Sequence, residues 1–235
     1  MKNPVIPFNP VKKKTFQFSK LGKSFKNISL ILKFFLIFAS KEEIMRKICI
    51  YCASSTQIAA CYKTEAYRLG EIFAENKIHC LYGGGSVGLM GELSKAMLKN
   101  GGTITGVIPQ FMVDEGWNNE SVEQIVVNTM HERKRLMLED VDAAIALPGG
   151  CGTLEELLEV ITWKQLGIFV KPIVILNVNH YFDPLLEMLN KAVDEKFMRS
   201  DHLRMWSVVE RAKDVLPAIE QAPEWRKDAI GMAAL

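Results

Sequence analysis

The 235-residue sequence lacks the marks of a specialised protein class. Its net charge is only +2, and with 49% hydrophobic and 24% charged residues it does not fit a disordered, collagen-like or coiled-coil chain. The four histidines are scattered and form no i, i+4 pair of the kind that binds a metal, so no metal site is expected. Internal repeats and low-complexity linkers are absent after residue 45. An ordinary globular domain is the expectation.

Basic charge is concentrated at one end of the chain. Residues 1–44 hold nine lysines and two glutamates, a net charge of +7, so residues 45–235 carry a net charge of −5. Proteins that bind nucleic acid favour a basic face, which this mildly acidic part does not offer. No nucleic-acid partner is therefore expected.

No apolar run is long enough to span a bilayer, which takes about 20 residues. The longest, residues 28–39, is shorter and includes Lys33. Together with the basic stretch before it, this run imitates a signal peptide or a membrane-surface anchor. A buried-strand pattern begins abruptly at Met45. We therefore expect residues 1–44 to be a basic extension that is poorly ordered or not native, and residues 45–235 to form a single domain without membrane contact.

Cysteines are few and odd in number: Cys49, Cys52, Cys61, Cys80 and Cys151. Their scatter among apolar segments indicates reduced thiols in a reducing compartment, and we expect a cytoplasmic protein. Cys49 and Cys52 form a C-x-x-C pair, but they lie along a predicted strand instead of at a helix N-terminus, where a redox thiolate is stabilised. No second such pair completes a zinc site. We interpret both as core cysteines.

Short strand patterns alternate with helical ones from residue 45 onward. Strands are predicted over residues 47–52, 78–82, 103–108, 123–128, 142–147 and 172–176, with a weaker one over 206–209. Helices are predicted over residues 58–76, 88–100, 131–140, 153–168, 181–195 and 211–219, where apolar residues recur at three- and four-residue spacing. The expected fold is α/β, a Rossmann-like doubly wound, mostly parallel sheet with helices on both faces. Residues 109–122 are its longest irregular piece.

Two glycine-rich turns each follow a predicted strand and open a predicted helix. The first reads G-G-G-S-V-G-L-M-G over residues 83–91, and the second reads P-G-G-C-G-T-L-E-E over residues 148–156. Glycines allow the backbone to approach a ligand closely, and the amides at a helix N-terminus can hold a phosphate. A tight turn without a ligand remains the alternative. The first turn is not a dinucleotide fingerprint, because no acidic residue ends the next strand.

Charged residues accompany these turns. Thr153 can cap its helix or donate a hydrogen bond to a phosphate, while Glu155 and Glu156 are either helix-start acids or carboxylates beside a nucleotide. In the M-H-E-R-K segment that begins another helix, Arg133 and Lys134 either neutralise a phosphate or form a solvated charged face. Ligands of open α/β sheets bind outside the carboxyl ends of the strands, so the three motifs should meet in one crevice.

These motifs resemble a known family. M-H-E-R-K at residues 130–134, followed by P-G-G-x-G-T-x-x-E at 148–156, is the paired signature of the LONELY GUY family, the cytokinin riboside 5′-monophosphate phosphoribohydrolases. Relatives were long labelled lysine decarboxylases. The likeness covers about residues 46–215 and includes the first glycine-rich turn. Cys151 departs from it, standing where the family often has Tyr or Phe, and the loop over residues 111–121 does not align well.

The resemblance implies hydrolysis of the N-glycosidic bond of adenosine 5′-monophosphates, often N6-substituted, to a free base and ribose 5-phosphate. It implies no cofactor and no metal, and a homodimer with active sites near the subunit interface. Glu156 would be catalytic as a base or as a stabiliser of an oxocarbenium-like transition state, and Arg133 would orient the phosphate or ribose. The predicted substrate-binding residues are Gly84, Gly85, Met90, Glu115, Met130, Lys134, Gly150, Cys151, Gly152, Thr153, Leu154, Glu155 and Thr162. Met90 and Met130 would line the base pocket, with a place in the core as the alternative.

Three other functions stay open. A nucleotide or cofactor carrier can share the fold, although such a carrier has no need of both Arg133 and Glu156. A hydrolase of plain AMP is not separated by the sequence, because specificity at N6 depends on the shape of the pocket. A decarboxylase needs pyridoxal phosphate and a Schiff-base lysine, and Lys134, Lys164 and Lys171 show no such context.

Overall fold

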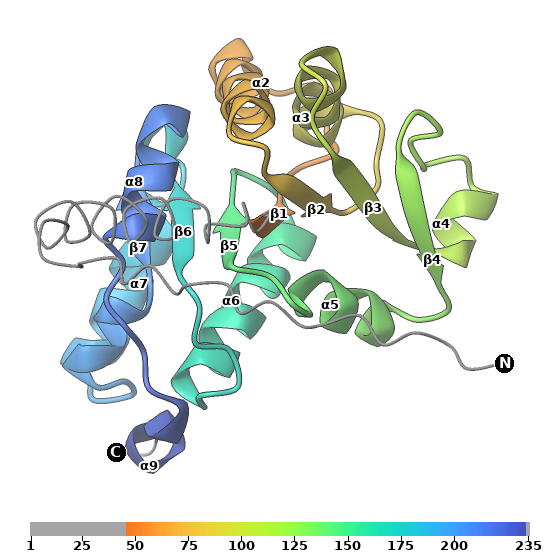
Figure 1. Ribbon diagram of the computed structural model, residues 1–235. Helices are drawn as coiled ribbons and strands as arrows, with labels where there is room; N and C mark the ends of the chain where they lie inside the picture. Colours follow the sequence, from red (N-terminus) through yellow and green to blue (C-terminus); the bar gives the residue numbers. More distant parts are fainter. Residues whose placement is uncertain (1–45, 234–235) are drawn as a thin grey trace, which may run out of the picture. The chain divides into compact units, whose positions relative to one another are not determined.

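The computed structural model describes residues 46–233, and the predictions made for residues 1–44 lie outside this range. Seven strands in the described residues form one parallel sheet in the order β4-β3-β2-β1-β5-β6-β7 (Figure 1). The strands are β1 Lys47–Tyr51, β2 His79–Tyr82, β3 Ile104–Pro109, β4 Glu123–Val127, β5 Ala143–Ala146, β6 Ile173–Leu176 and β7 Ser207–Val209. All the predicted strands are confirmed, with ends shifted by at most one residue.

Helices connect the strands. The helices are α2 Ala60–Glu75, α3 Gly88–Lys99, α4 Gln110–Asp114, α5 Met130–Leu138, α6 Cys151–Gln165, α7 Asp183–Asp194, α8 Val215–Glu220 and α9 Ile230–Ala233. The predicted helices are confirmed, whereas α4 lies in the loop that was expected to be irregular. A helix of about one turn is too short to show a period in its apolar residues, so the sequence predicts neither α4 nor α9. None of the helices within residues 46–233 is long and apolar enough to cross a membrane.

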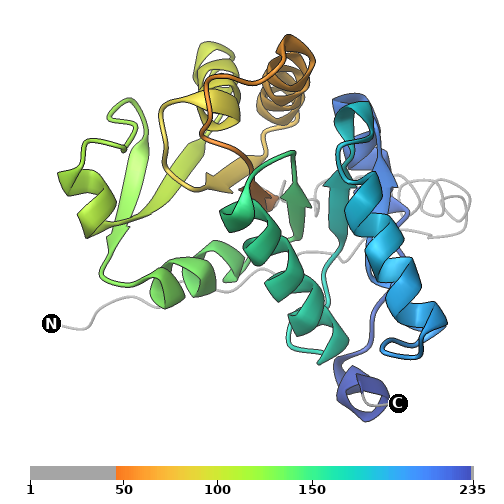
Figure 2. The same cartoon turned by 180° about the vertical axis from the view of Figure 1, so that it is seen from behind.

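The helices cover both faces of the sheet (Figures 1 and 2). One core, between the sheet and α2, α3 and α8, is built around Ile48, Leu69 and Leu93. The other, between the sheet and α5, α6 and α7, is built around Cys49 and Leu157. Neighbouring residues of β1 serve opposite cores because side chains alternate across a strand. The doubly wound α/β fold is therefore confirmed.

The centre of the sheet is a topological switch point. β1 lies between β2 and β5, and the chain leaves β1 for α2 on one face but leaves β5 for α6 on the other. The two connections therefore separate at the carboxyl ends of β1 and β5. This is the place where ligands bind in open α/β sheets.

The cysteines are all free. Cys49, Cys52 and Cys80 are buried, whereas Cys61 and Cys151 are exposed. Burial raises the pKa of the Cys49 and Cys52 thiols far above its ordinary value, so the C-x-x-C pair consists of protonated thiols at neutral pH. The interpretation as core cysteines agrees with this environment.

Candidate active site

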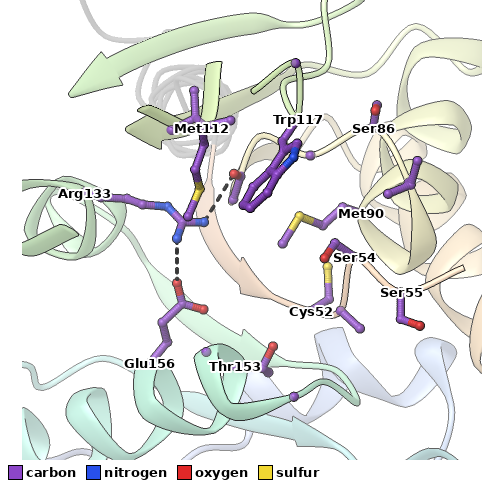
Figure 3. Close-up of a pocket in the computed structure, with 18 residues that line it drawn as sticks. Cys52, Ser54, Ser55, Ser86, Met90, Met112, Trp117, Arg133, Thr153 and Glu156 are labelled. Carbon is purple, nitrogen blue, oxygen red and sulfur yellow. Dashed lines mark hydrogen bonds and ion pairs between the residues drawn. The ribbon is translucent and has the colours of Figure 1, made fainter. Parts of the chain in front are cut away.

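A cavity of about 650 Å³ opens at the carboxyl ends of the central strands (Figure 3). Its volume lies within the range of small-molecule sites, about 300–1,000 Å³. Its walls come from the segment after β1, the glycine turn after β2, the loop after β3, and the N-terminal halves of α5 and α6. The lining residues are Cys52, Ala53, Ser54, Ser55, Gly83, Gly85, Ser86, Val87, Met90, Ile108, Met112, Gly116, Trp117, Arg133, Gly150, Gly152, Thr153 and Glu156.

Arg133 enters the cavity from α5. This helix starts where the Thr129 hydroxyl accepts a hydrogen bond from the Glu132 amide at 3.1 Å, and the cap fixes which side chains of the first turn face the sheet. Nε of Arg133 donates to the carbonyl of Val107 at 2.9 Å, and Nη2 donates to the carbonyl of Gly83 at 3.2 Å. Two backbone carbonyls, one within β3 and one directly after β2, therefore hold the guanidinium in place.

The remaining nitrogen of this guanidinium faces a carboxylate. Nη1 of Arg133 lies 3.6 Å from Oε1 of Glu156, and the two side chains are only 8% and 9% exposed. Burial raises the pKa of Glu156 from its ordinary value of 4.5 to about 7, because the charged form loses its water, while the charge of Arg133 opposes the rise. A carboxyl group with a pKa near 7 can exchange a proton at neutral pH, a property typical of functional sites.

The first glycine turn lets the guanidinium come this close. A Cβ added at Gly83 would lie 2.5 Å from Nη2 of Arg133 and 2.8 Å from Cε of Met90. Gly84 follows with a φ of +80°, in the left-handed region that favours glycine. A side chain at Gly83 would therefore force Nη2 of Arg133 away from the carbonyl of Gly83.

The second glycine turn brings a helix N-terminus to the cavity wall. Gly150 is the N-cap of α6, and the carbonyl of Gly149 accepts a hydrogen bond from the Tyr181 hydroxyl at 2.6 Å. A glycine has no side chain with which to satisfy the first amides of the helix, so these amides can hold an anion such as a phosphate. Within the described residues, no group of three or more His, Cys, Asp or Glu side chains is arranged to hold a metal ion.

The loop between β3 and β4 supplies an apolar wall. The buried side-chain amide of Asn119 donates to the hydroxyls of Tyr82 and Ser94 at 3.2 and 3.0 Å, and its backbone amide donates to the carbonyl of Gly84 at 2.8 Å. These bonds hold the loop beside the first glycine turn, so that Trp117 reaches the cavity although it is 57% exposed (Figure 3). A tryptophan placed in this way offers a flat apolar surface to a ligand.

Comparison with known proteins adds to this geometry. Residues 90–219 match the protein family described as "Possible lysine decarboxylase". The chain is 45% identical over 177 residues to the cytokinin riboside 5′-monophosphate phosphoribohydrolase LOG2 of Arabidopsis thaliana, which covers 75% of this chain and 83% of the relative. It is 44% identical over 182 residues to the phosphoribohydrolase LOG of Oryza sativa subsp. japonica, covering 77% of this chain and 75% of the relative. The chain belongs to the LONELY GUY family.

Solved structures with other names share the fold of this chain. The molybdenum cofactor carrier protein of Chlamydomonas reinhardtii aligns with a TM-score of 0.57 over 76% of this chain and 98% of that protein, at 22% identity. The molybdenum cofactor binding protein of Rippkaea orientalis aligns with a TM-score of 0.58 over 75% and 96%, at 21% identity. Identities this low show a common fold and no more.

The cavity gathers part of the site that the LONELY GUY resemblance predicts. Seven predicted residues line it, namely Gly85, Met90, Arg133, Gly150, Gly152, Thr153 and Glu156. The other eight lie outside its lining, namely Gly84, Glu115, Met130, Lys134, Cys151, Leu154, Glu155 and Thr162. Glu155 and Thr162 lie on the exposed side of α6, whereas Lys134 is buried against that helix. The roles of all fifteen stay predictions.

Several lining residues were not predicted from the sequence. Residues 52–55 directly follow β1 at its carboxyl end, beside the switch point. Because ligands bind at such a point, their position after a central strand could have identified them as lining residues. Met112 and Trp117 belong to a loop without a motif. Long-range contacts, namely the hydrogen bonds of Asn119 and a β-bridge between Gly85 and Asn118, bring that loop to the cavity.

Proposed function

We propose that this protein hydrolyses the N-glycosidic bond of adenosine 5′-monophosphates, N6-substituted ones included, and releases the free base and ribose 5-phosphate. The buried pair of Arg133 and Glu156 carries the proposal, because it shares one cavity with the N-terminus of α6. A base with a pKa near 7 and an anion site are the two parts that such a reaction needs. The names of the two plant relatives, both phosphoribohydrolases of cytokinin riboside 5′-monophosphates, support this assignment.

We assign each group a step in this reaction. The first amides of α6 and the hydroxyl of Thr153 hold the phosphate, and Arg133 orients the ribose. Glu156 accepts a proton from water as the water oxygen bonds to the anomeric carbon and the bond to the base nitrogen breaks. The base leaves with the electron pair of that bond and takes up a proton from solvent, and Glu156 then releases its own proton to solvent. The carboxylate also stabilises the positive charge of the oxocarbenium-like transition state.

The apolar wall favours a substituted base over plain AMP. Met90 and Trp117 line the side of the cavity away from Glu156, and Met112 lies between Trp117 and Arg133 in the view of Figure 3. Thioether and indole groups contact hydrocarbon well and offer little to the amino group of unsubstituted adenine. We therefore propose that an apolar N6 substituent packs against this wall.

A product assay on the full chain tests this function. The protein is incubated with AMP, with N6-isopentenyladenosine 5′-monophosphate and with the two dephosphorylated nucleosides, and released bases are separated by chromatography. We expect base from the monophosphates only, and a higher kcat/KM for the isopentenyl compound. Binding of the nucleotides without release of any base would replace the proposal with a carrier function. A higher kcat/KM for AMP would leave the hydrolysis and overturn the preference at N6.

We also propose that the protein is a homodimer. The outer side of α6 exposes Leu158 and Thr162 next to Glu155, and Ile168 beyond its end is 66% exposed. Leu158 on α6 and Ile168 just after it are exposed apolar side chains of the kind that subunit contacts bury. Sedimentation of the full chain should show a dimer, and Leu158→Asp should shift it to the monomer. A monomeric unaltered protein would contradict this arrangement.

A cytoplasmic location completes the proposal. The free thiols support a reducing compartment, because exposed cysteines such as Cys61 oxidise elsewhere. Cell fractionation is the test, and recovery of the protein in an oxidising compartment would contradict it.

A further inference from the structure

Next to the pair of Arg133 and Glu156 lies a second charged contact between the same two helices. Nζ of Lys134 lies 2.5 Å from Oε1 of Glu155 and 3.1 Å from Oε1 of Glu159. The Lys134 side chain is only 8% exposed, whereas Glu155 and Glu159 are 54% and 26% exposed. Consecutive residues of α5 thus contact consecutive residues of α6, Arg133 with Glu156 and Lys134 with Glu155.

The ammonium of Lys134 is already neutralised inside the protein. The carboxylates of Glu155 and Glu159, one helical turn apart, both form ion pairs with it. Lys134 is not among the residues that line the cavity. A phosphate brought to it would meet the negative charges of Glu155 and Glu159 as well, which disfavours the phosphate. These contacts argue against the phosphate-binding role that the charge of Lys134 suggests in the sequence.

We propose that Lys134 is a positioning residue, which with Glu155 and Glu159 fixes α5 against α6 so that Arg133 and Glu156 face each other. This inference rests on the proposed function. Two side chains on adjacent positions of one helix point about 100° apart, so one contact alone lets the helices turn about it. The second contact removes that freedom. A misplacement of about 1 Å between catalytic groups is enough to lower a rate by about 100-fold.

The cluster also sets the charge around Glu156. Arg133 and Lys134 of α5, Glu155 and Glu159 of α6, and the protonated Cys49, Tyr51 and Cys52 of the β1 segment face this carboxyl. Lys134 favours the ionised form of Glu156, and the two glutamates disfavour it. Removing the lysine charge should therefore raise the pKa of Glu156, and removing a glutamate charge should lower it.

Lys134→Met and Glu159→Gln should shift the pKa of Glu156 in opposite directions. Simple loosening of the structure would not produce opposite shifts, so the two variants distinguish it from a positioning role. We compare Lys134→Met, Lys134→Arg and Glu159→Gln with the unaltered full chain, measuring kcat against pH and the Kd of AMP. We expect kcat of Lys134→Met to fall about 10- to 100-fold, with the acid limb of the pH profile moved upward. Glu159→Gln should move that limb downward, and Lys134→Arg should restore most of the rate. The Kd of AMP should change less than about threefold in all of them.

Arg135→Met is the matched control. Arg135 also lies on α5 and pairs with a glutamate, Glu139 at 3.0 Å, but both side chains are exposed. Its kcat should stay within about twofold, as is usual for an exposed pair. If Lys134→Met fails to fold, the acid limb of the pH profile can still be measured in Glu159→Gln and Lys134→Arg. The positioning role alone would be overturned if the unaltered protein is active but Lys134→Met binds AMP tenfold more weakly and leaves the acid limb unmoved. Absence of any base release by the unaltered protein would overturn the proposed function and this inference with it.

Discussion

Replacing Glu156 with Gln is expected to lower kcat by about 100- to 10,000-fold, the range that general acid–base catalysis contributes. Gln keeps the size of the side chain but accepts no proton from water and carries no negative charge for the oxocarbenium-like transition state. The loss should appear in kcat, with KM little changed, since the phosphate is held elsewhere in the cavity. Release of base in single-turnover experiments measures it.

Glu139→Gln is the matched control for this substitution. Glu139 is exposed and lies at the end of α5, away from the cavity lining. Its replacement should leave kcat within about twofold of the unaltered protein. Near-normal turnover of Glu156→Gln would remove this residue from the mechanism. A loss of similar size in Glu139→Gln would show that the effect is not specific to the buried carboxyl.

The same substitution should stabilise the protein above neutral pH. The carboxyl of Glu156 has a pKa of about 7 when folded and 4.5 when freely solvated, so unfolding releases a proton between these values. Its contribution to stability is complete below pH 4.5 and is lost as the pH rises through 7. Gln stays neutral, so Glu156→Gln should gain on the order of 3 kcal/mol at pH 8. Thermal unfolding should show a higher Tm for the variant at pH 8 and an equal Tm at pH 4.

The fold follows from local patterns that the sequence shows directly. Segments such as residues 47–52 and 172–176 are short and apolar, and the amphipathic stretches between them have helical spacing. Strand order is a different matter, since it depends on contacts between distant segments. The crevice exists because β1 pairs with β5, which places Ile48 opposite Ala143. No local sequence pattern predicts this pairing. Because crossover connections between parallel strands are right-handed, the alternation of strands and helices predicts that a switch point exists. It does not predict between which strands the switch point lies.

The site divides in the same way. Arg133 and Glu156 are found from motifs that each lie within a few residues of a strand end. Adjacent residues are harder to separate, because Arg133 turns into the cavity while Lys134 turns toward α6. Their difference is the rotation of about 100° per residue along a helix, set by where α5 begins. No local sequence pattern predicts that Trp117 belongs to the site. The loop that carries Trp117 is brought there by the buried Asn119, which bonds to residues on β2 and α3.

Removing the guanidinium of Arg133 is expected to have the second largest effect. Arg133→Met loses both hydrogen bonds to carbonyls and the ion pair with Glu156, and we expect kcat/KM to fall about 1,000-fold. The acid limb of the pH profile should also move upward, because the cation that favours ionised Glu156 is gone. Arg133→Lys should recover only part of the rate. An ammonium supplies the charge but not the planar fork that reaches Val107, Gly83 and Glu156 at once.

Gly83→Ala tests the placement of the guanidinium while leaving Arg133 in the chain. The added methyl would lie 2.5 Å from Nη2, so the side chain must shift and lose its bond to the carbonyl of Gly83. We expect kcat to fall at least about tenfold. Gly231→Ala serves as the control, because a Cβ there meets no atom within 4 Å and the residue lies far along the chain from the cavity motifs. Full activity of Gly83→Ala beside an inactive Arg133→Met would mean that the charge of Arg133 matters and its bond to the carbonyl of Gly83 does not.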